Sequence, residues 1–203
     1  MPQTPHPSPE RRPSRLVVFF GLSGSGKSYL ARRWAARHGY GYHNSDEVRK
    51  ELSGVAPDSR HHVEFNVGLY SPEQSRRTYA ALLQRAGRDL DSQALAGAVL
   101  DGSYTNGVER QKVVDRFSAQ IVISFILCSC STALTRERFA LRGRDEQAVS
   151  DGRWEIYCKQ KEGFEPPTHI GGARLLNLDT DAHVDKLIER VDAFVLPGPE
   201  QNN

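Results

Sequence analysis

Residues 21–28 have the sequence GLSGSGKS, with glycines, lysine and serine at the spacing of a phosphate-binding loop. In such a loop, backbone N–H groups surround phosphate oxygens, the lysine reaches the β- and γ-phosphates, and the last hydroxyl holds Mg²⁺. We therefore predict that the chain binds a nucleoside triphosphate. The predicted nucleotide contacts are Gly21, Ser23, Gly24, Ser25, Gly26, Lys27, Ser28 and Tyr29, and Lys27 is also a predicted catalytic residue.

The motif has the flanks that such a loop requires. Residues 16–20 (LVVFF) are a run of β-branched and aromatic residues, which predicts a buried strand. After the loop, Leu30 and Trp34 recur at helical spacing, and Gly39 stands where a helix C-cap belongs. The positive end of this helix then faces the phosphates.

Alternating strands and helices follow the loop. Further apolar runs predict strands at residues 40–44, 98–100, 121–127 and 174–178, with helices between them. Ser45 is the predicted N-cap of a helix over residues 46–52, and Ser71 followed by Pro72 predicts another helix start. Residues 53–71 show no clear period, so we expect an irregular excursion over the active face. The predicted fold class is α/β, a P-loop NTPase-type five-stranded parallel sheet with helices on both faces.

The ends of these strands predict where the site lies. Ligands of parallel sheets bind beyond the carboxyl ends of the strands, so the residues that follow the strands should share one cleft. Besides the loop, these residues are Ser45 and Asp46, residues 101–103, and Cys128. Asp46 and Asp101 are carboxylates placed directly after predicted strands. Two simpler interpretations stay open, namely that Asp46 caps a helix and that Asp101 forms a turn before glycine.

The chain resembles the P-loop kinases grouped with polynucleotide 5′-hydroxyl kinase, zeta toxin, chloramphenicol phosphotransferase and gluconate kinase. The similarity runs over residues 16–194. Its markers are residues 21–28, 44–49 (NSDEVR), 70–79 and 99–101, the arginines within 136–144, and residues 164–167 (FEPP). Relatives often have Asp-Ala-Thr after the third strand, where this chain has Asp101, Gly102 and Ser103.

The resemblance implies an ATP-dependent kinase that transfers the γ-phosphate of ATP-Mg²⁺ to a hydroxyl group, with Asp46 as general base. It implies that Ser28 and Asp101 hold Mg²⁺. Arg138 and Arg142 are four residues apart, so they project from one helical face. In the resembling kinases such a pair forms an arginine-bearing lid over the adenine and the transferred phosphate, which makes both residues predicted catalytic residues and Arg138 a nucleotide contact. The alternative for these arginines is a solvated helical face.

The acceptor is less well defined by the sequence. Asp46, Arg49, Tyr70 and Arg110 are the predicted substrate residues, from their positions after the second strand and after Asp101. The chain has no Asn-Lys-x-Asp run for guanine, which favours ATP. The leading hypothesis is a small-molecule hydroxyl acceptor, and the alternatives are a polynucleotide 5′-hydroxyl kinase and a non-catalytic regulatory NTP-binding module. A net charge of +2 and the lack of an aromatic–basic stacking platform disfavour nucleic acid.

Composition sets the remaining expectations. The 203 residues suit one domain at residues 15–196, between predicted disordered tails at 1–14 and 197–203. Three cysteines, an odd number, favour reduced thiols and a cytoplasmic protein. No apolar run approaches the length of a membrane span, so we expect no membrane partner. A monomer or weak dimer is the expected state.

Overall fold

The fold is described by a computed structural model that covers residues 14–54, 71–119, 121–142 and 154–196. Within these residues the strands are β1 (Arg15–Phe20), β2 (Gly41–Asn44), β3 (Gly97–Gly102), β4 (Val122–Ser129) and β5 (Arg174–Asp179). The helices are α1 (Lys27–His38), α2 (Ser45–Leu52), α3 (Pro72–Asp91), α4 (Gly107–Phe117), α5 (Thr132–Arg142), α6 (Trp154–Glu162) and α7 (Val184–Val195).

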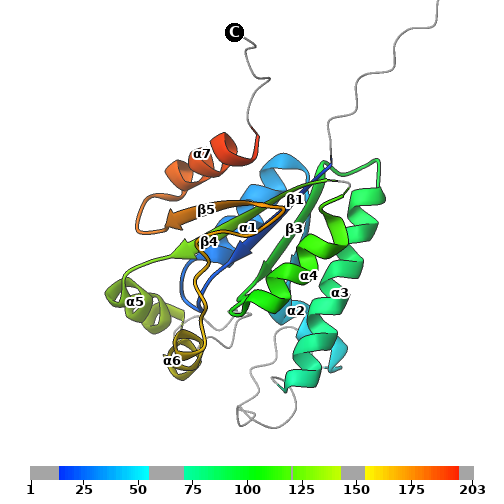
Figure 1. The fold of residues 1–203 in the computed structure, drawn as a ribbon. Helices are drawn as coiled ribbons and strands as arrows, with labels where there is room; N and C mark the ends of the chain where they lie inside the picture. The colour runs from blue at the N-terminus through cyan, green and yellow to red at the C-terminus, as the bar shows by residue number, and fades with distance from the viewer. Residues whose placement is uncertain (1–13, 55–70, 120, 143–153, 197–203) are drawn as a thin grey trace, which may run out of the picture.

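The five strands form one parallel sheet in the order β2-β3-β1-β4-β5 (Figure 1). The chain places β2 and β3 on one side of β1, and β4 and β5 on the other. The predicted five-stranded α/β fold is therefore confirmed. A ligand crevice is expected beyond the carboxyl end of the central strand, where the chain order changes side.

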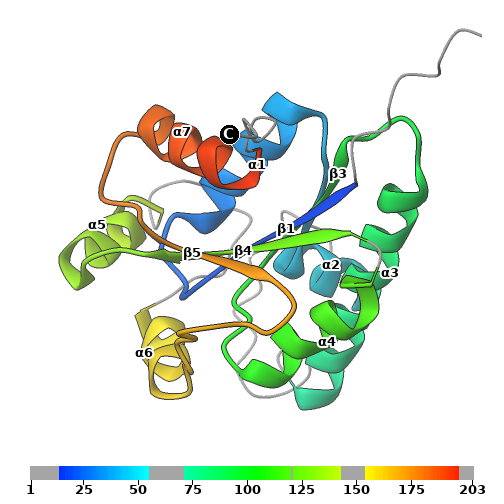
Figure 2. The same ribbon diagram turned by 45° about the horizontal axis from the view of Figure 1, so that its top comes forward.

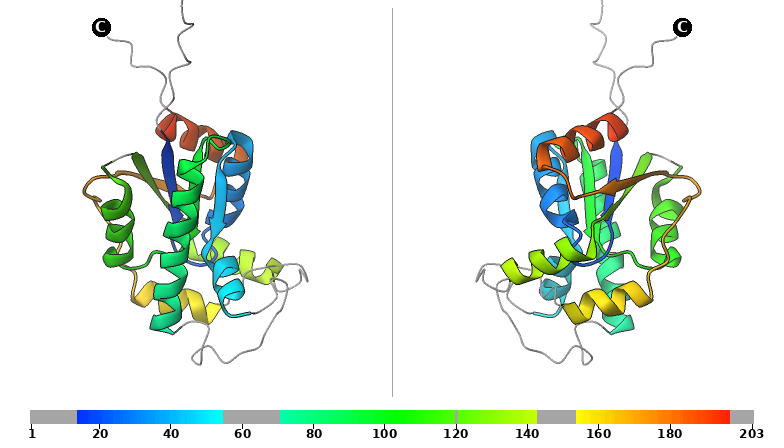
Figure 3. Two further views of the ribbon diagram at one scale, coloured as in Figure 1. Left: turned by 90° about the vertical axis from the view of Figure 1, so that its right-hand side faces the viewer. Right: turned by 90° about the vertical axis from the view of Figure 1, so that its left-hand side faces the viewer.

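Two helical layers cover the sheet, and β1 contributes to both cores (Figures 2 and 3). Val18 and Phe20 pack in the core under α3 and α4, whereas Val17 and Phe19 pack under α1 and α7. All four side chains are fully buried. Burial on both faces explains why this strand is a continuous apolar run without alternation.

Strand β3 is longer than its apolar stretch. The sequence predicts a strand at residues 98–100, but β3 extends to Gly102 and includes Asp101. Asp101 pairs with Phe19 of β1 and with Asn44 of β2. The two neighbouring ladders hold the backbone here, so a charged residue continues the strand.

The N-cap of α2 is Asn44, so the prediction that Ser45 caps this helix was wrong. Asn44 Oδ1 accepts hydrogen bonds from the N–H groups of Asp46 and Glu47, at 2.9 and 3.1 Å. Ser45 is the first helical residue. Asparagine and serine are nearly equal N-caps, so local preference does not decide between neighbours. The strand pairing of Asn44 sets the start of the helix.

Several expectations concern residues outside the described part of the chain. The tails at 1–14 and 197–203 and the excursion at 53–71 lie wholly or mostly outside it. Among the described residues, no helix combines the length and the apolar character needed to cross a membrane.

Candidate active site

A cavity of about 600 Å³ lies at the carboxyl ends of the strands, where the strand-end rule predicts a cleft. The loop residues that line it are Ser23, Gly24, Gly26, Lys27 and Ser28. The opposite wall comes from the first turns of α2, α3 and α4, the segment between β3 and α4, and α6. The phosphate-binding loop and Asp46 therefore share one cavity.

The first glycine of the loop is required by its backbone and by its neighbour. Gly21 has a φ of 137°, and a Cβ atom there would lie 2.2 Å from the carbonyl oxygen of Cys128. Cys128 is buried beneath the loop and does not line the cavity, so its predicted place in the cleft was wrong. Burial raises the pKa of the Cys128 thiol to about 12, which keeps it neutral.

Lys27 begins α1 and faces the cavity. Its ammonium Nζ donates to the carbonyl oxygen of Leu22 at 3.4 Å, across the mouth of the loop. Ser28, the predicted metal ligand of the loop, lines the same cavity. Both residues therefore lie at the N-terminus of α1, the end of a helix that binds anions.

Thr180 supports the phosphate-binding loop by a hydrogen bond to its backbone, and it was not among the residues predicted from the sequence. The Thr180 side chain is buried and its Oγ1 donates to the carbonyl oxygen of Ser25 at 2.7 Å. Arg138 of α5 donates to Thr180 O at 2.9 Å and to Gly24 O at 3.3 Å. Thr180 directly follows β5, so the strand-end rule was the signal that could have found it.

The other predicted nucleotide and lid residues differ in where they lie relative to the loop and the cavity. Arg138 bonds the backbone of the loop but does not line the cavity, so its contact with the nucleotide stays a prediction. Tyr29 is 56% exposed, its hydroxyl accepts from Arg33 at 2.9 Å, and it does not line the cavity. Arg142 ends α5, and its side chain lies outside the described part of the structure.

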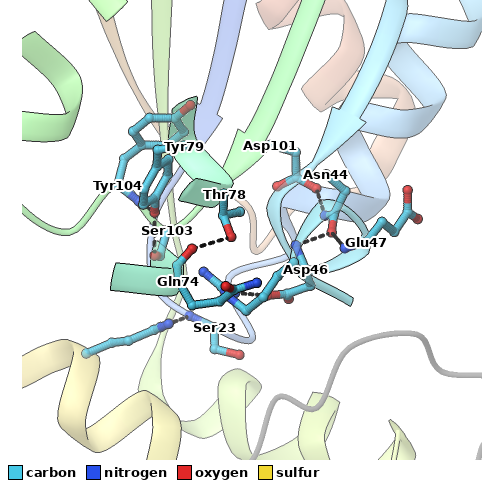
Figure 4. Close-up of polar contacts among 12 residues, drawn as sticks. Ser23, Asn44, Asp46, Glu47, Gln74, Thr78, Tyr79, Asp101, Ser103 and Tyr104 are labelled. Carbon is cyan, nitrogen blue, oxygen red and sulfur yellow. Dashed lines mark hydrogen bonds and ion pairs between the residues drawn. The ribbon is translucent and has the colours of Figure 1, made fainter. Parts of the chain in front are cut away.

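Asp101 is a fully buried carboxylate beside β1. Its Oδ2 accepts a hydrogen bond from Asn44 Nδ2 at 2.6 Å (Figure 4). The same oxygen accepts from Tyr42 Oη at 2.7 Å. Burial, followed by the charge of Asp101 and the hydrogen bond to it, raises the pKa of Tyr42, so this phenol stays a donor. The other oxygen, Oδ1, is buried without a hydrogen-bond partner.

The orphaned Oδ1 atom fits the predicted magnesium role of Asp101. A buried carboxylate oxygen without a donor is costly, and a water molecule of a hydrated cation would satisfy it. Among the described residues, this site included, no three His, Cys, Asp or Glu side chains gather as a metal site. This donor set suits Mg²⁺, which keeps several waters and takes few protein ligands beside phosphates.

Asn44 joins the carboxylate of Asp101 to the backbone of the first turn of α2. A backbone N–H can only donate, so the end of the amide that faces α2 must be its oxygen. The NH₂ end then points to Asp101, as the 2.6 Å contact shows. One side chain therefore fixes the start of α2 relative to β3.

Asp46 does not cap α2, because Asn44 does. Its carboxylate lines the cavity, is 32% exposed and accepts from Arg49 NH1 at 2.9 Å. Arg49 also lines the cavity and is 7% exposed. This ion pair leaves one side of the Asp46 carboxylate open to the cavity. The simplest structural explanation for Asp46, that it caps α2, is therefore removed.

The far wall of the cavity contains Ser103, as the strand-end rule predicted, and further residues that the sequence did not single out. Tyr79 of α3 lies 3.3 Å, hydroxyl to hydroxyl, from Ser103. Tyr104 has a φ of 43° and a buried side chain, so Ser103 and Thr105 on either side of it both face the cavity. Arg76 of α3 and Lys112 of α4 line the same wall. Hydroxyl groups and cations therefore face the loop.

Two predicted substrate residues are not part of this wall. Arg110 is buried, donates to Tyr104 O at 2.6 Å and to Glu165 O at 2.8 Å, and does not line the cavity. Its guanidinium joins two backbone segments, so the structure does not bring it together with the other predicted substrate residues. Tyr70 lies outside the described residues.

A match to a known sequence family shows where this chain belongs. The model of a family of AAA domains matches residues 16–167. The chain belongs to this family. No protein with a curated description matches the sequence at a significant level.

Solved structures place this AAA domain among folds of the P-loop kinase group. A gluconokinase from Sinorhizobium meliloti 1021 is 21% identical, with a TM-score of 0.60 over 92% of this chain and 93% of the other. The Mycobacterium tuberculosis APS kinase in complex with AMPPNP and APS is 19% identical, with a TM-score of 0.57 over 89% and 96%. Chaetomium thermophilum Kti12 in complex with ADP-AlF3 is 17% identical, with a TM-score of 0.60 over 89% and 98%. At these identities the likeness shows the fold.

The buried bridge of this AAA domain gives a test at Asn44. Asn44→Ala removes the helix cap and a donor to a buried carboxylate, so we expect about 2–4 kcal/mol less stability. Asn44→Asp keeps a capping oxygen but sets a second carboxylate against Asp101. At pH 7 we therefore expect Asn44→Asp to lose more free energy of unfolding than Asn44→Ala. Urea unfolding in the presence of EDTA is the measurement.

The pH dependence separates the two variants. In Asn44→Asp, repulsion raises the folded-state pKa of the introduced carboxyl above its ordinary value of about 4. Relative to the parent, this variant should therefore regain stability as the pH falls from 7 to 5. Asn44→Ala adds no titrating group and only removes one donor from Asp101, so it should show a smaller recovery. Equal pH profiles for the two variants would contradict the bridge.

Proposed function

We propose that this AAA domain is a kinase that transfers the γ-phosphoryl group of ATP-Mg²⁺ to a hydroxyl group of a small-molecule acceptor. One observation carries the proposal: Lys27 of the loop and Asp46 of α2 line the same cavity. The gluconokinase and APS kinase folds support phosphoryl transfer, and the nucleotide analogues bound by APS kinase and Kti12 support a nucleotide ligand.

The nucleotide half is formed by the loop. Its N–H groups and Lys27 would bind the phosphates, and Arg138 and Thr180 hold the loop from outside. Ser28 and Asp101 would hold Mg²⁺, which would neutralise negative charge on the phosphates. Arg142, four residues after Arg138 in the sequence, would supply further positive charge to the transferred group.

The acceptor half is centred on Asp46. The acceptor oxygen forms a bond to the γ-phosphorus while the bond to the β–γ bridging oxygen breaks, and ADP leaves. The hydroxyl proton goes to Asp46 late in this step. Arg49 holds the Asp46 carboxylate in place through its 2.9 Å contact.

The charges of the cavity indicate an acidic acceptor. Its lining cations are Lys27, Arg49, Arg76 and Lys112, and its lining acids are Asp46 and Glu109. Arg49 pairs with Asp46, and Lys112 pairs with Glu109 at 2.8 Å. Lys27 would bind the phosphates of the nucleotide. Arg76 has no ion pair within the described residues, so it can meet a carboxylate or phosphate of the acceptor.

Replacement of Lys27 tests the nucleotide half. Lys27→Ala should abolish phosphoryl transfer, because it removes the charge that stabilises the β- and γ-phosphates in the transition state. ATP consumption with the acceptor is the measurement. Lys186→Ala, the same change on the exposed face of α7, should match the parent. Parent-like turnover by Lys27→Ala would refute the loop assignment.

Replacement of Asp46 tests the general base. In Asp46→Asn, an amide still accepts from Arg49 but cannot take a proton. The variant should fold and bind ATP-Mg²⁺ normally, yet transfer phosphate at least about a hundredfold more slowly. Asp185 is likewise the second residue of its helix but is exposed, so Asp185→Asn is the matched control. Near-normal transfer by Asp46→Asn would remove Asp46 from the mechanism.

A panel of acceptors tests the expected substrate class. ATP consumption is measured with matched neutral and acidic hydroxyl compounds, such as a sugar, its acid and its phosphate, and with single-stranded oligonucleotides. Acidic small molecules should have the highest kcat/KM, and Arg76→Ala should lower it about tenfold, the scale of one charged hydrogen bond. Arg77→Ala, the adjacent exposed arginine outside the cavity lining, is the control.

The outcomes of the panel separate the alternatives. Best turnover of oligonucleotides would favour a polynucleotide 5′-hydroxyl kinase. ATP binding without transfer to any compound would favour a non-catalytic NTP-binding module. Equal kcat/KM for a neutral compound and its acid would contradict the role of Arg76.

A further inference from the structure

Helix α6 reaches the phosphate-binding loop through a single side chain. Gln160 Oε1 accepts a hydrogen bond from the backbone N–H of Ser23 at 2.7 Å. The two residues are 137 positions apart, and Ser23 is buried in the loop. Helices α5 and α6 lie beyond the carboxyl ends of the strands, away from the two layers that cover the sheet (Figures 1 and 3). The contact therefore joins a peripheral helix to the centre of the site.

The orientation of the Gln160 amide follows from its partner. The Ser23 N–H group can only donate, so the amide oxygen faces the loop and the NH₂ group points away from it. Gln160 lines the cavity, and its Nε2 atom has no hydrogen-bond partner among the described residues. Two N–H donors are therefore presented to the cavity by an amide whose other end is already held.

Gln160 lines the same cavity as the lysine that indicates where the γ-phosphoryl group is expected. Lys27 Nζ, the group that reaches the β- and γ-phosphates, contacts the carbonyl oxygen of Leu22 at 3.4 Å. That carbonyl and the Ser23 N–H belong to one trans peptide unit, so Lys27 and Gln160 contact opposite edges of it. Ser23, Lys27, Asp46 and Gln160 all line the one cavity. A phosphoryl group between the loop and Asp46 would lie within this set.

We propose that Gln160 binds the γ-phosphoryl group through Nε2 and thereby distinguishes a nucleoside triphosphate from a diphosphate. The inference rests on the proposed nucleotide site but not on any acceptor. Because Ser23 fixes the amide, the donors are oriented before the ligand arrives, which reduces the entropy lost on binding. A diphosphate has no oxygen at this position and gains nothing from Gln160.

The test compares triphosphate and diphosphate affinity in variants of Gln160. Gln160→Glu keeps an oxygen for Ser23 but replaces the donors with a negative charge that repels phosphate. Binding of AMPPNP and of ADP, each with Mg²⁺, is measured by calorimetry on the full chain. We expect AMPPNP affinity to fall at least about tenfold in Gln160→Glu, the scale of one charged hydrogen bond, and ADP affinity to stay within about twofold.

Two further variants complete the design. Gln160→Ala removes both the Ser23 contact and the donors, and should also weaken AMPPNP more than ADP. Gln111→Glu makes the same charge change on the exposed face of α4, where Gln111 bonds Asp115, and should leave both affinities unchanged. Thermal melting without nucleotide checks that the variants are folded.

The outcomes are distinguishable. Equal losses for AMPPNP and ADP in both Gln160 variants would mean that Gln160 only anchors α6, and unchanged AMPPNP affinity would mean that it does not meet the γ-phosphoryl group. Either result overturns the inference and leaves the proposed kinase activity intact. Failure of the parent protein to bind both nucleotides would overturn the loop assignment itself, and the inference with it.

Discussion

The buried carboxylate of Asp101 is the group on which the arrangement of the site depends. A fully buried carboxylate is stable only when donors replace the water that it has lost. Tyr42 and Asn44 supply two donors to Oδ2, and both come from the neighbouring strand β2. The need to satisfy Asp101 therefore ties β2 to β3 at the edge of the sheet that faces the cavity. Because β3 also pairs with β1, the same contacts place β2 relative to the phosphate-binding loop.

Asn44 extends this constraint to the acceptor side of the cavity. Its amide donates to Asp101 and accepts from the first turn of α2, so strand and helix meet in one orientation. Asp46 is two residues further on, and its carboxylate is left to Arg49 and the cavity. The loop is held in a comparable way by distant parts of the chain, since Thr180 and Arg138 bond its backbone carbonyls. Rigid support of this kind keeps a site in order before a ligand binds.

Local patterns in the sequence predicted the fold and the centre of the site. The loop is a contiguous motif, the strands are apolar runs, and the strand-end rule placed Asp46 at the cavity. Local pattern could not separate Asn44 from Ser45 as the cap, because the deciding contact is with Asp101 in another strand. Gln160 gave no signal, since its contact with the loop spans 137 residues. Arg110 does not join the other predicted substrate residues because α4 turns its side chain toward backbone carbonyls instead of the cavity.

The two halves of the cavity differ in what they can specify. The nucleotide half comes mainly from one contiguous segment, β1, the loop and α1, and a segment of this kind recognises phosphates largely through its backbone. The opposite half is assembled from the first turns of α2, α3 and α4, and it contacts a ligand through side chains that can vary without change to the sheet. A fold shared with a gluconokinase, an APS kinase and Kti12 therefore leaves the acceptor open. Within the described residues, the cations of this half each have an acidic partner except Arg76, so the choice of acceptor depends most on the α3 wall.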